Sequence, residues 1–299
     1  MRRKEKLLGG LFSFFIAFFL FLLLFICVSK ATLLNKGFLL STLDKSEYYT
    51  GVTRALTEDF KKSAGAAGFQ PSVYDGFLKE ADVKKAAIQY IETSFTGKEA
   101  AVDQESFKKQ LNDHLQKVIK TENIKLDEDS KLRLENYIKV NAKGYKQFVQ
   151  FPFIQYIVMG IQMMDRVLPF AIAACVLLLL LSVFFLIRMK LKRKDTLLFL
   201  GSAAGGAGWM LTLLPAGILL GGYTHRIRLE PEYFYKFFVA FLDGYLWMLI
   251  LFGLALILMG IILICLFIKK EIPYMLLENK IQQLFRVFRN HLYCPQLLK

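Results

Sequence analysis

The amino-acid sequence predicts an all-α membrane protein, with four transmembrane helices and a helical extracytoplasmic domain between the first and the second. Four apolar runs, at residues 7–28, 169–187, 197–220 and 239–268, are the first observation behind this prediction. Each is close to or above the roughly 20 residues with which a helix crosses a bilayer. The polar stretch after the first run is the second observation, because its apolar residues recur at helical spacing and rarely alternate as in strands.

Basic residues mark one side of the membrane. The chain has a formal net charge of +14, and segments 1–6, 188–196 and 269–299 carry +3, +4 and +4 of it. Residues 29–165 are nearly balanced, with 20 Lys and Arg against 18 Asp and Glu. Short loops rich in Lys and Arg stay cytoplasmic, so both termini are expected inside. The positive charge then faces the bilayer surface, and no nucleic-acid partner is expected.

The cysteines indicate how the polar stretch is stabilised. Cys27, Cys175 and Cys265 lie in apolar runs and Cys294 lies in the tail, which leaves the polar stretch without any. It is therefore not a disulfide framework. The chain also has no Asn-x-Ser/Thr sequon, and a bacterial plasma membrane is the expected location.

The first run has two interpretations. Basic residues precede residues 7–28, and Ser29 to Ala31 resembles a small-x-small cleavage site. However, the apolar core of a signal peptide usually spans about 7–15 residues, and this run is longer. The favoured interpretation is an uncleaved signal anchor, with cleavage as the alternative.

Apolar stripes predict the helices of the extracytoplasmic domain, residues 29–147. Asp44 and Glu47 have the spacing of a capping box before the first stripe, a second helix is expected to start at residues 72–75, and Asp103 precedes the third stripe. The stripes are Tyr48, Val52, Leu56 and Phe60; Val83, Ala87, Tyr90, Ile91 and Phe95; Phe107, Leu111, Leu115, Val118 and Ile119; and Leu134, Ile138 and Tyr145. Together they predict an all-α bundle.

Residues 148–168 are too apolar for an ordinary surface linker. They form either an interfacial segment or a stalk that extends the second transmembrane helix outward, kinked at Pro169.

The transmembrane helices differ in composition. The second, 169–187, is close to uniform Leu, Phe and Val, which suits contact with lipid. The third, 197–220, carries Gly201, Gly205 and Gly208. Small residues let helix backbones approach closely in lipid, so these three glycines are predicted to be a helix-packing site.

The outer loop, 221–238, and the start of the fourth transmembrane helix, 239–268, carry polar and aromatic residues. Tyr233, Phe234 and Tyr235 fit an interfacial aromatic belt. The charged residues of the loop either face lipid headgroups or dock onto the large domain; they are Arg226, Arg228, Glu230 and Glu232. Asp243 is a candidate intramembrane polar residue or reaches the headgroups, and no second acid or histidine is expected at its depth.

Two cytoplasmic segments form candidate basic surfaces. In the loop 188–196 these residues are Arg188, Lys190, Lys192, Arg193 and Lys194. The tail 269–299 has the pattern of a basic amphipathic helix. It binds either the anionic inner leaflet or a cytoplasmic protein partner.

The sequence predicts no catalytic, cofactor or metal site. His114, expected on a helix surface, His225 and His291 fall in three separate segments. The metalloprotease, thioredoxin-type, nucleophile-elbow and Walker sequences do not occur. The expected function is therefore non-enzymatic, with the extracytoplasmic domain binding a protein partner for assembly or sensing.

The alternative is a membrane subunit of a transport system. One transmembrane helix, a large outer domain and three further helices, with both termini inside, resemble FtsX and MacB-type permeases of ABC systems in length and topology. The resemblance implies that the loop 188–196 and the tail face an ATPase carried on another chain.

Overall fold

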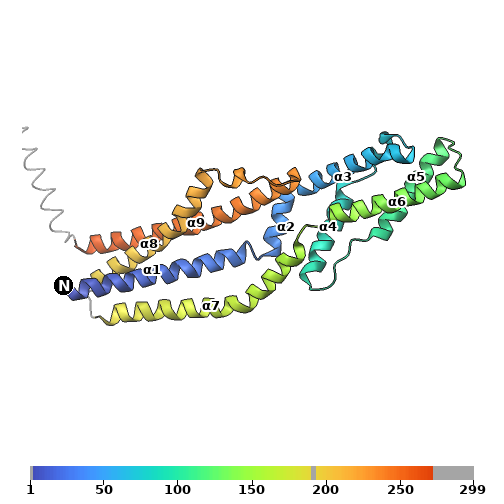
Figure 1. Cartoon of the computed structure of the whole chain (residues 1–299). Coiled ribbons are helices and arrows are strands. Elements are labelled where there is room, and N and C mark those ends of the chain that lie inside the picture. Colours follow the sequence, from blue (N-terminus) through green and yellow to red (C-terminus); the bar gives the residue numbers. More distant parts are fainter. Residues whose placement is uncertain (1–2, 190–192, 272–299) are drawn as a thin grey trace, which may run out of the picture. The chain divides into compact units, whose positions relative to one another are not determined.

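The computed structural model describes residues 3–189 and 193–271, and all regular secondary structure in these two ranges is helical (Figure 1). The predicted all-α class is confirmed for this part of the chain. The α-helices are α1 (Arg3–Ala31), α2 (Lys36–Lys45), α3 (Tyr48–Ala64), α4 (Glu80–Phe95), α5 (Gln104–Thr121), α6 (Glu128–Val149), α7 (Ile154–Arg188), α8 (Arg193–Leu220) and α9 (Glu232–Glu271). Short 3₁₀ turns lie at Gly65–Ala67, Pro71–Tyr74 and Thr224–Arg226.

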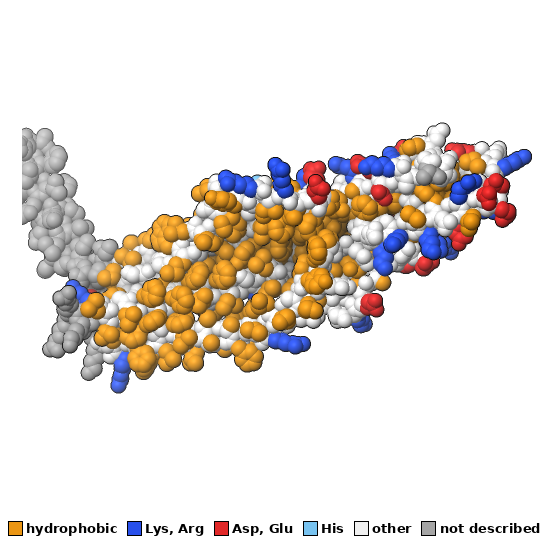
Figure 2. All heavy atoms as spheres, viewed as in Figure 1, with side chains coloured by type: hydrophobic (Ala, Val, Ile, Leu, Met, Phe, Trp, Pro, Cys, Tyr) orange, Lys and Arg blue, Asp and Glu red, His pale blue; other side chains and the backbone are white. Residues whose placement is uncertain are grey.

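Within the described ranges, four helical stretches are long and apolar enough to cross a membrane, as predicted. They fall within Lys6–Ala31, Glu128–Arg188, Asp195–Arg226 and Glu232–Leu266. Figure 2 shows mostly hydrophobic side chains over α1, α7 and most of α8 and α9, whereas many of the charged side chains in view gather over α3–α6.

The chain divides into two compact units. The polar unit consists of Ser29–Pro169 and Gly221–Tyr245; the apolar unit consists of Met1–Val28, Phe170–Leu220 and Leu246–Lys299. The divisions fall inside α1, α7 and α9, so each of these helices contributes residues to both units.

The core of the polar unit is built from the predicted stripes. Every stripe residue is buried there except Phe95 and Val118, which are partly buried and pack against the core. Asp103, which precedes the third stripe, caps α5, because its Oδ1 accepts a hydrogen bond from the Ser106 amide at 2.9 Å. Each large buried apolar side chain contributes about 1.5–3 kcal/mol of transfer free energy.

The predicted capping box and one predicted helix start are wrong. Asp44 lies inside α2 and pairs with Lys84, while Glu47 adopts a left-handed φ of 55° and makes no side-chain cap to α3, which begins at Tyr48. The second start, at residues 72–75, falls on the 3₁₀ turn Pro71–Tyr74 and the residue that ends it, and α4 begins only at Glu80.

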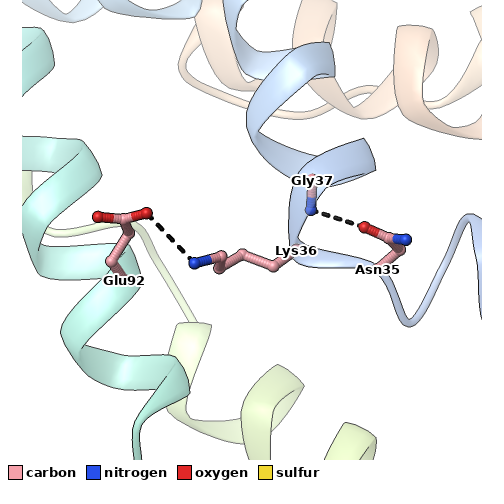
Figure 3. Close-up of polar contacts among 4 residues, drawn as sticks. All are labelled: Asn35, Lys36, Gly37 and Glu92. Carbon is pink, nitrogen blue, oxygen red and sulfur yellow. Dashed lines mark hydrogen bonds and ion pairs between the residues drawn. The ribbon is translucent and has the colours of Figure 1, made fainter.

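Helix α2 was not predicted. Asn35 begins it, since its Oδ1 accepts a hydrogen bond from the amide of Gly37 at 2.7 Å (Figure 3) and another from the amide of Phe38 at 3.2 Å. The Lys36 Nζ lies 3.2 Å from Glu92 Oε1 of α4. Leu39 and Leu43 of α2 are buried in the core.

Residues 148–168 are mostly helical. Helix α7 runs from Ile154 to Arg188 with Pro169 inside it, so these residues continue the second apolar helix. Ile154 and Val158 are buried in the polar-unit core together with Phe151.

Helix α8 contacts two other helices of the apolar unit. The Ser13 hydroxyl of α1 donates a hydrogen bond to the Phe199 carbonyl of α8 at 2.8 Å. Ala203, Ala207 and Leu211 are at most 1% exposed. Helix α7 instead exposes leucines and phenylalanines, which fits the lipid-facing composition predicted for it; they include Leu177, Leu180 and Phe184.

Candidate functional site

The segment between α8 and the middle of α9 is part of the polar-unit core. Phe237 of α9 is 3% exposed, and its ring centroid lies 5.4 Å from that of Phe151 and 6.0 Å from that of Tyr48. The Tyr233 ring lies 5.3 Å from Tyr48. A Cβ atom on Gly51 would come within 2.3 Å of Tyr233 Cβ, so glycine is required there. We call these contacts the aromatic junction.

Aromatic residues at the start of α9 pack onto the polar-unit core. Tyr233 and Phe234 are half-buried against it, and Tyr235 donates a hydrogen bond to the His225 carbonyl at 3.3 Å. The interfacial belt expected for these three residues stays a prediction. The charged residues of the loop are exposed; they are Arg226, Arg228, Glu230 and Glu232.

Asp243 has a neighbour that was not predicted. Its Oδ2 lies 3.8 Å from His225 Nε2, and its Oδ1 is buried without a hydrogen-bond partner among the described residues. The expectation that no histidine lies near Asp243 is therefore wrong. The 3₁₀ turn Thr224–Arg226 brings His225 back toward α9. Sequence spacing alone does not predict this contact between residues 18 positions apart.

A groove lies along the surface between α5 and α6, with a volume of about 560 Å³. Leu126, Leu134 and Ile138 line it from the α6 side, and Leu134 and Ile138 also belong to the buried core. Polar and charged residues form the rest of the lining: Glu105, Lys108, Lys109, Asn112, Gln116, Lys131 and Glu135. This surface combines a small apolar floor with charged edges.

The three predicted packing glycines lie along α8 facing α9. A Cβ atom on Gly208 would lie 2.6 Å from the Gly253 carbonyl oxygen, and one on Gly201 would lie 3.0 Å from the Gly260 carbonyl oxygen. The backbone of Gly205 takes part in the same contact with α9, because a Cβ atom on Gly260 would lie 2.8 Å from the Gly205 nitrogen. Gly253 and Gly260 were not predicted, although their spacing of two helical turns is visible in the sequence.

The basic surface of the loop 188–196 is described only in part. Arg188 ends α7 and is exposed. Lys190 and Lys192 lie outside the described residues, as do the side chains of Arg193 and Lys194 and most of the tail.

His114, expected on a helix surface, lies half-buried on α5. Its Nε2 lies 2.8 Å from the Val73 carbonyl oxygen, within hydrogen-bonding distance, and its ring stacks on Phe77 with centroids 4.5 Å apart. Within residues 3–189 and 193–271, no three His, Cys, Asp or Glu side chains are grouped as metal ligands.

A buried network of hydroxyl groups was also not predicted. The hydroxyls of Tyr74 and Tyr137 lie 2.6 Å apart, Tyr137 reaches Ser63 at 3.3 Å, and Ser63 donates to Asn141 Oδ1 at 3.1 Å. Burial, and then the hydrogen bond with Tyr137, raise the pKa of Tyr74. The network links α3, η2 (Pro71–Tyr74) and α6 inside the core.

Buried tyrosines predict that the polar unit loses stability in alkali. Burial and the nearby Asp44 raise the pKa of Tyr49 to about 12, against 10.0 for a free phenol. The stabilising neutral form is fully present below pH 10 and is lost as the pH rises toward about 12. Melting temperatures followed by circular dichroism should therefore fall over this range. The fall should be smaller in Tyr49→Phe, and an identical pH profile in that variant would refute the assignment.

Comparison of the chain with protein-family models, curated proteins and solved structures found no match.

Proposed function

We propose that the chain is a non-enzymatic, multi-pass membrane protein whose polar unit lies outside the cytoplasm of a bacterial cell and binds a protein partner, for assembly or sensing. The aromatic junction is the observation that carries this proposal. Through it, the polar unit holds residues of α3, the α6–α7 link and α9 in one core. A binding domain packed in this way can pass a change at its surface to helices that continue into the apolar unit.

The charge pattern supports the proposed orientation. Residues 29–165 are nearly neutral, with 20 Lys and Arg against 18 Asp and Glu, whereas segments 1–6, 188–196 and 269–299 are basic. Lys and Arg in short flanking loops favour the cytoplasmic side. The polar unit then lies outside the cytoplasm, and the part of the partner that binds it lies there too.

Purification from mild detergent, with mass spectrometry of co-purifying proteins, tests the proposal. The expected result is a stoichiometric partner with an extracytoplasmic domain. The double variant Lys190→Gln, Lys192→Gln is the control, because it alters the cytoplasmic loop and preserves three of its five basic residues. The partner should still co-purify with this variant. A stoichiometric cytoplasmic ATPase in its place would contradict the proposal and favour a transport subunit. Hydrolytic or redox turnover by the purified chain would contradict the non-enzymatic assignment.

A further inference from the structure

We propose that the groove between α5 and α6 binds an amphipathic helix of the protein partner, with carboxylates of that helix facing Lys108 and Lys109. This inference rests on the proposed function, because it names the surface through which the polar unit meets its partner. The groove, of about 560 Å³, is lined by residues of both helices and of the link before α6.

The apolar floor has the spacing that receives a helix. Leu134 and Ile138 lie one turn apart on α6, about 6 Å along its axis, and Leu126 extends the floor at the start of that helix. Grooves that bind helices take apolar anchors at positions i, i+3 or i+4, and i+7 of the partner. Two or three such anchors match this floor.

The α5 wall is polar and regularly spaced. Lys108, Asn112 and Gln116 follow one another at intervals of four residues, so they lie along one edge of α5. A lysine at one end and two side-chain amides beyond it offer hydrogen-bond donors to a row of acidic groups. Apolar residues of α5 face the other way, into the core; they are Phe107, Leu111, Leu115 and Ile119.

The lysines of the groove favour a partner helix with carboxylates along one edge. Lys131 already pairs with Glu128 at 2.7 Å. Neither Lys108 nor Lys109 has an ion-pair partner within the described ranges. These two adjacent cations on α5 are therefore available to carboxylates.

Glu105 and Glu135 favour a protein helix over an anionic membrane surface. Both carboxylates line the groove beside the lysines. A uniformly negative bilayer would be repelled by them. A helix can instead place carboxylates against Lys108 and Lys109 and uncharged or basic side chains against Glu105 and Glu135. Complementary patterns of this kind fix orientation and partner choice.

A pair of designed peptides tests the proposal on the full chain in phosphatidylcholine nanodiscs. The acidic peptide is a helix of about 18 residues with leucines at i, i+3 and i+7 and glutamates on one flank. The matched peptide has lysines in place of those glutamates. Fluorescence anisotropy should show saturable binding of the acidic peptide and at least about tenfold weaker binding of the basic one.

Charge reversal locates the site. K108E combined with K109E should weaken binding of the acidic peptide by at least about tenfold. The matched control, K139E with K143E, reverses two exposed lysines of α6 outside the groove lining and should change binding by less than about twofold. Equal affinities for the two peptides, or equal losses in the two variants, would overturn the proposal.

Two further outcomes separate this inference from the proposed function. Phosphatidylglycerol vesicles that bind the nanodisc-held chain through Lys108 and Lys109 would assign the groove to lipid and overturn the helix proposal. A co-purifying extracytoplasmic partner that K108E with K109E fully retains would also overturn it, while the proposed function stands. Absence of any such partner from the unaltered chain would instead contradict the proposed function.

Discussion

Replacement of Gly208 by leucine is expected to separate α8 from α9 and to cause a large loss of stability. A Cβ atom at this position would lie 2.6 Å from the Gly253 carbonyl oxygen and 2.9 Å from the Ile257 backbone nitrogen. Backbone atoms of a packed helix cannot yield as a flexible side chain can. Overpacking typically costs about 1–3 kcal/mol, and a cost near the upper end would lower the melting temperature by roughly 6–12 °C. Thermal unfolding in detergent measures the change.

Gly217 provides the matched control, because it lies on the same helix and a Cβ atom there would meet no atom within 4 Å. Gly217→Leu should change the melting temperature by far less than Gly208→Leu. A Gly208→Leu protein as stable as the unaltered chain would show that the glycine face of α8 does not set helix packing.

Truncation of Phe237 to alanine is expected to open the aromatic junction. This side chain is 3% exposed and packs against Tyr48, Phe151 and Phe234. Removing a buried phenylalanine costs about 3–5 kcal/mol, including the cavity left behind. If α3 is held by the junction, amide hydrogen exchange in Tyr48–Ala64 should become about a hundredfold faster or more. Exchange followed by mass spectrometry gives this value peptide by peptide.

Tyr223→Ala is the control for the junction. Tyr223 belongs to the same chain segment but is 57% exposed, and its loss should leave exchange in α3 nearly unchanged. If Phe237→Ala also leaves the α3 amides protected from exchange, the segment Gly221–Tyr245 does not contribute to the stability of the polar-unit core.

Apolar periodicity predicted the parts of the fold that depend on local sequence. The stripe from Tyr48 to Phe60 identifies the buried face of α3, because four residues separate successive members and a helix brings them to one side. Small residues likewise marked the α8 face that meets α9, since contact between backbones needs side chains of minimal size.

Features that depend on distant contacts were not predicted. Asn35 begins a helix of only 10 residues, of which Leu39, Thr42 and Leu43 are buried, so α2 has no apolar stripe long enough to predict a helix. Tyr233 and Phe234 have the composition of an interfacial belt, and only tertiary packing brings them half-buried against the polar-unit core. The approach of His225 to Asp243 is also set by the fold of the loop and not by spacing.

Labelling of a single cysteine tests most directly whether the polar unit lies outside the cytoplasm. The native cysteines, Cys27, Cys175, Cys265 and Cys294, are first replaced by serine or alanine. Ser106→Cys then places a thiol on the exposed surface of α5, and Thr196→Cys places one at the last residue of the basic loop 188–196. A membrane-impermeant maleimide should label Ser106→Cys in intact cells and Thr196→Cys only after lysis. Labelling of Ser106→Cys only after lysis would contradict the proposed orientation and, with it, an extracytoplasmic partner.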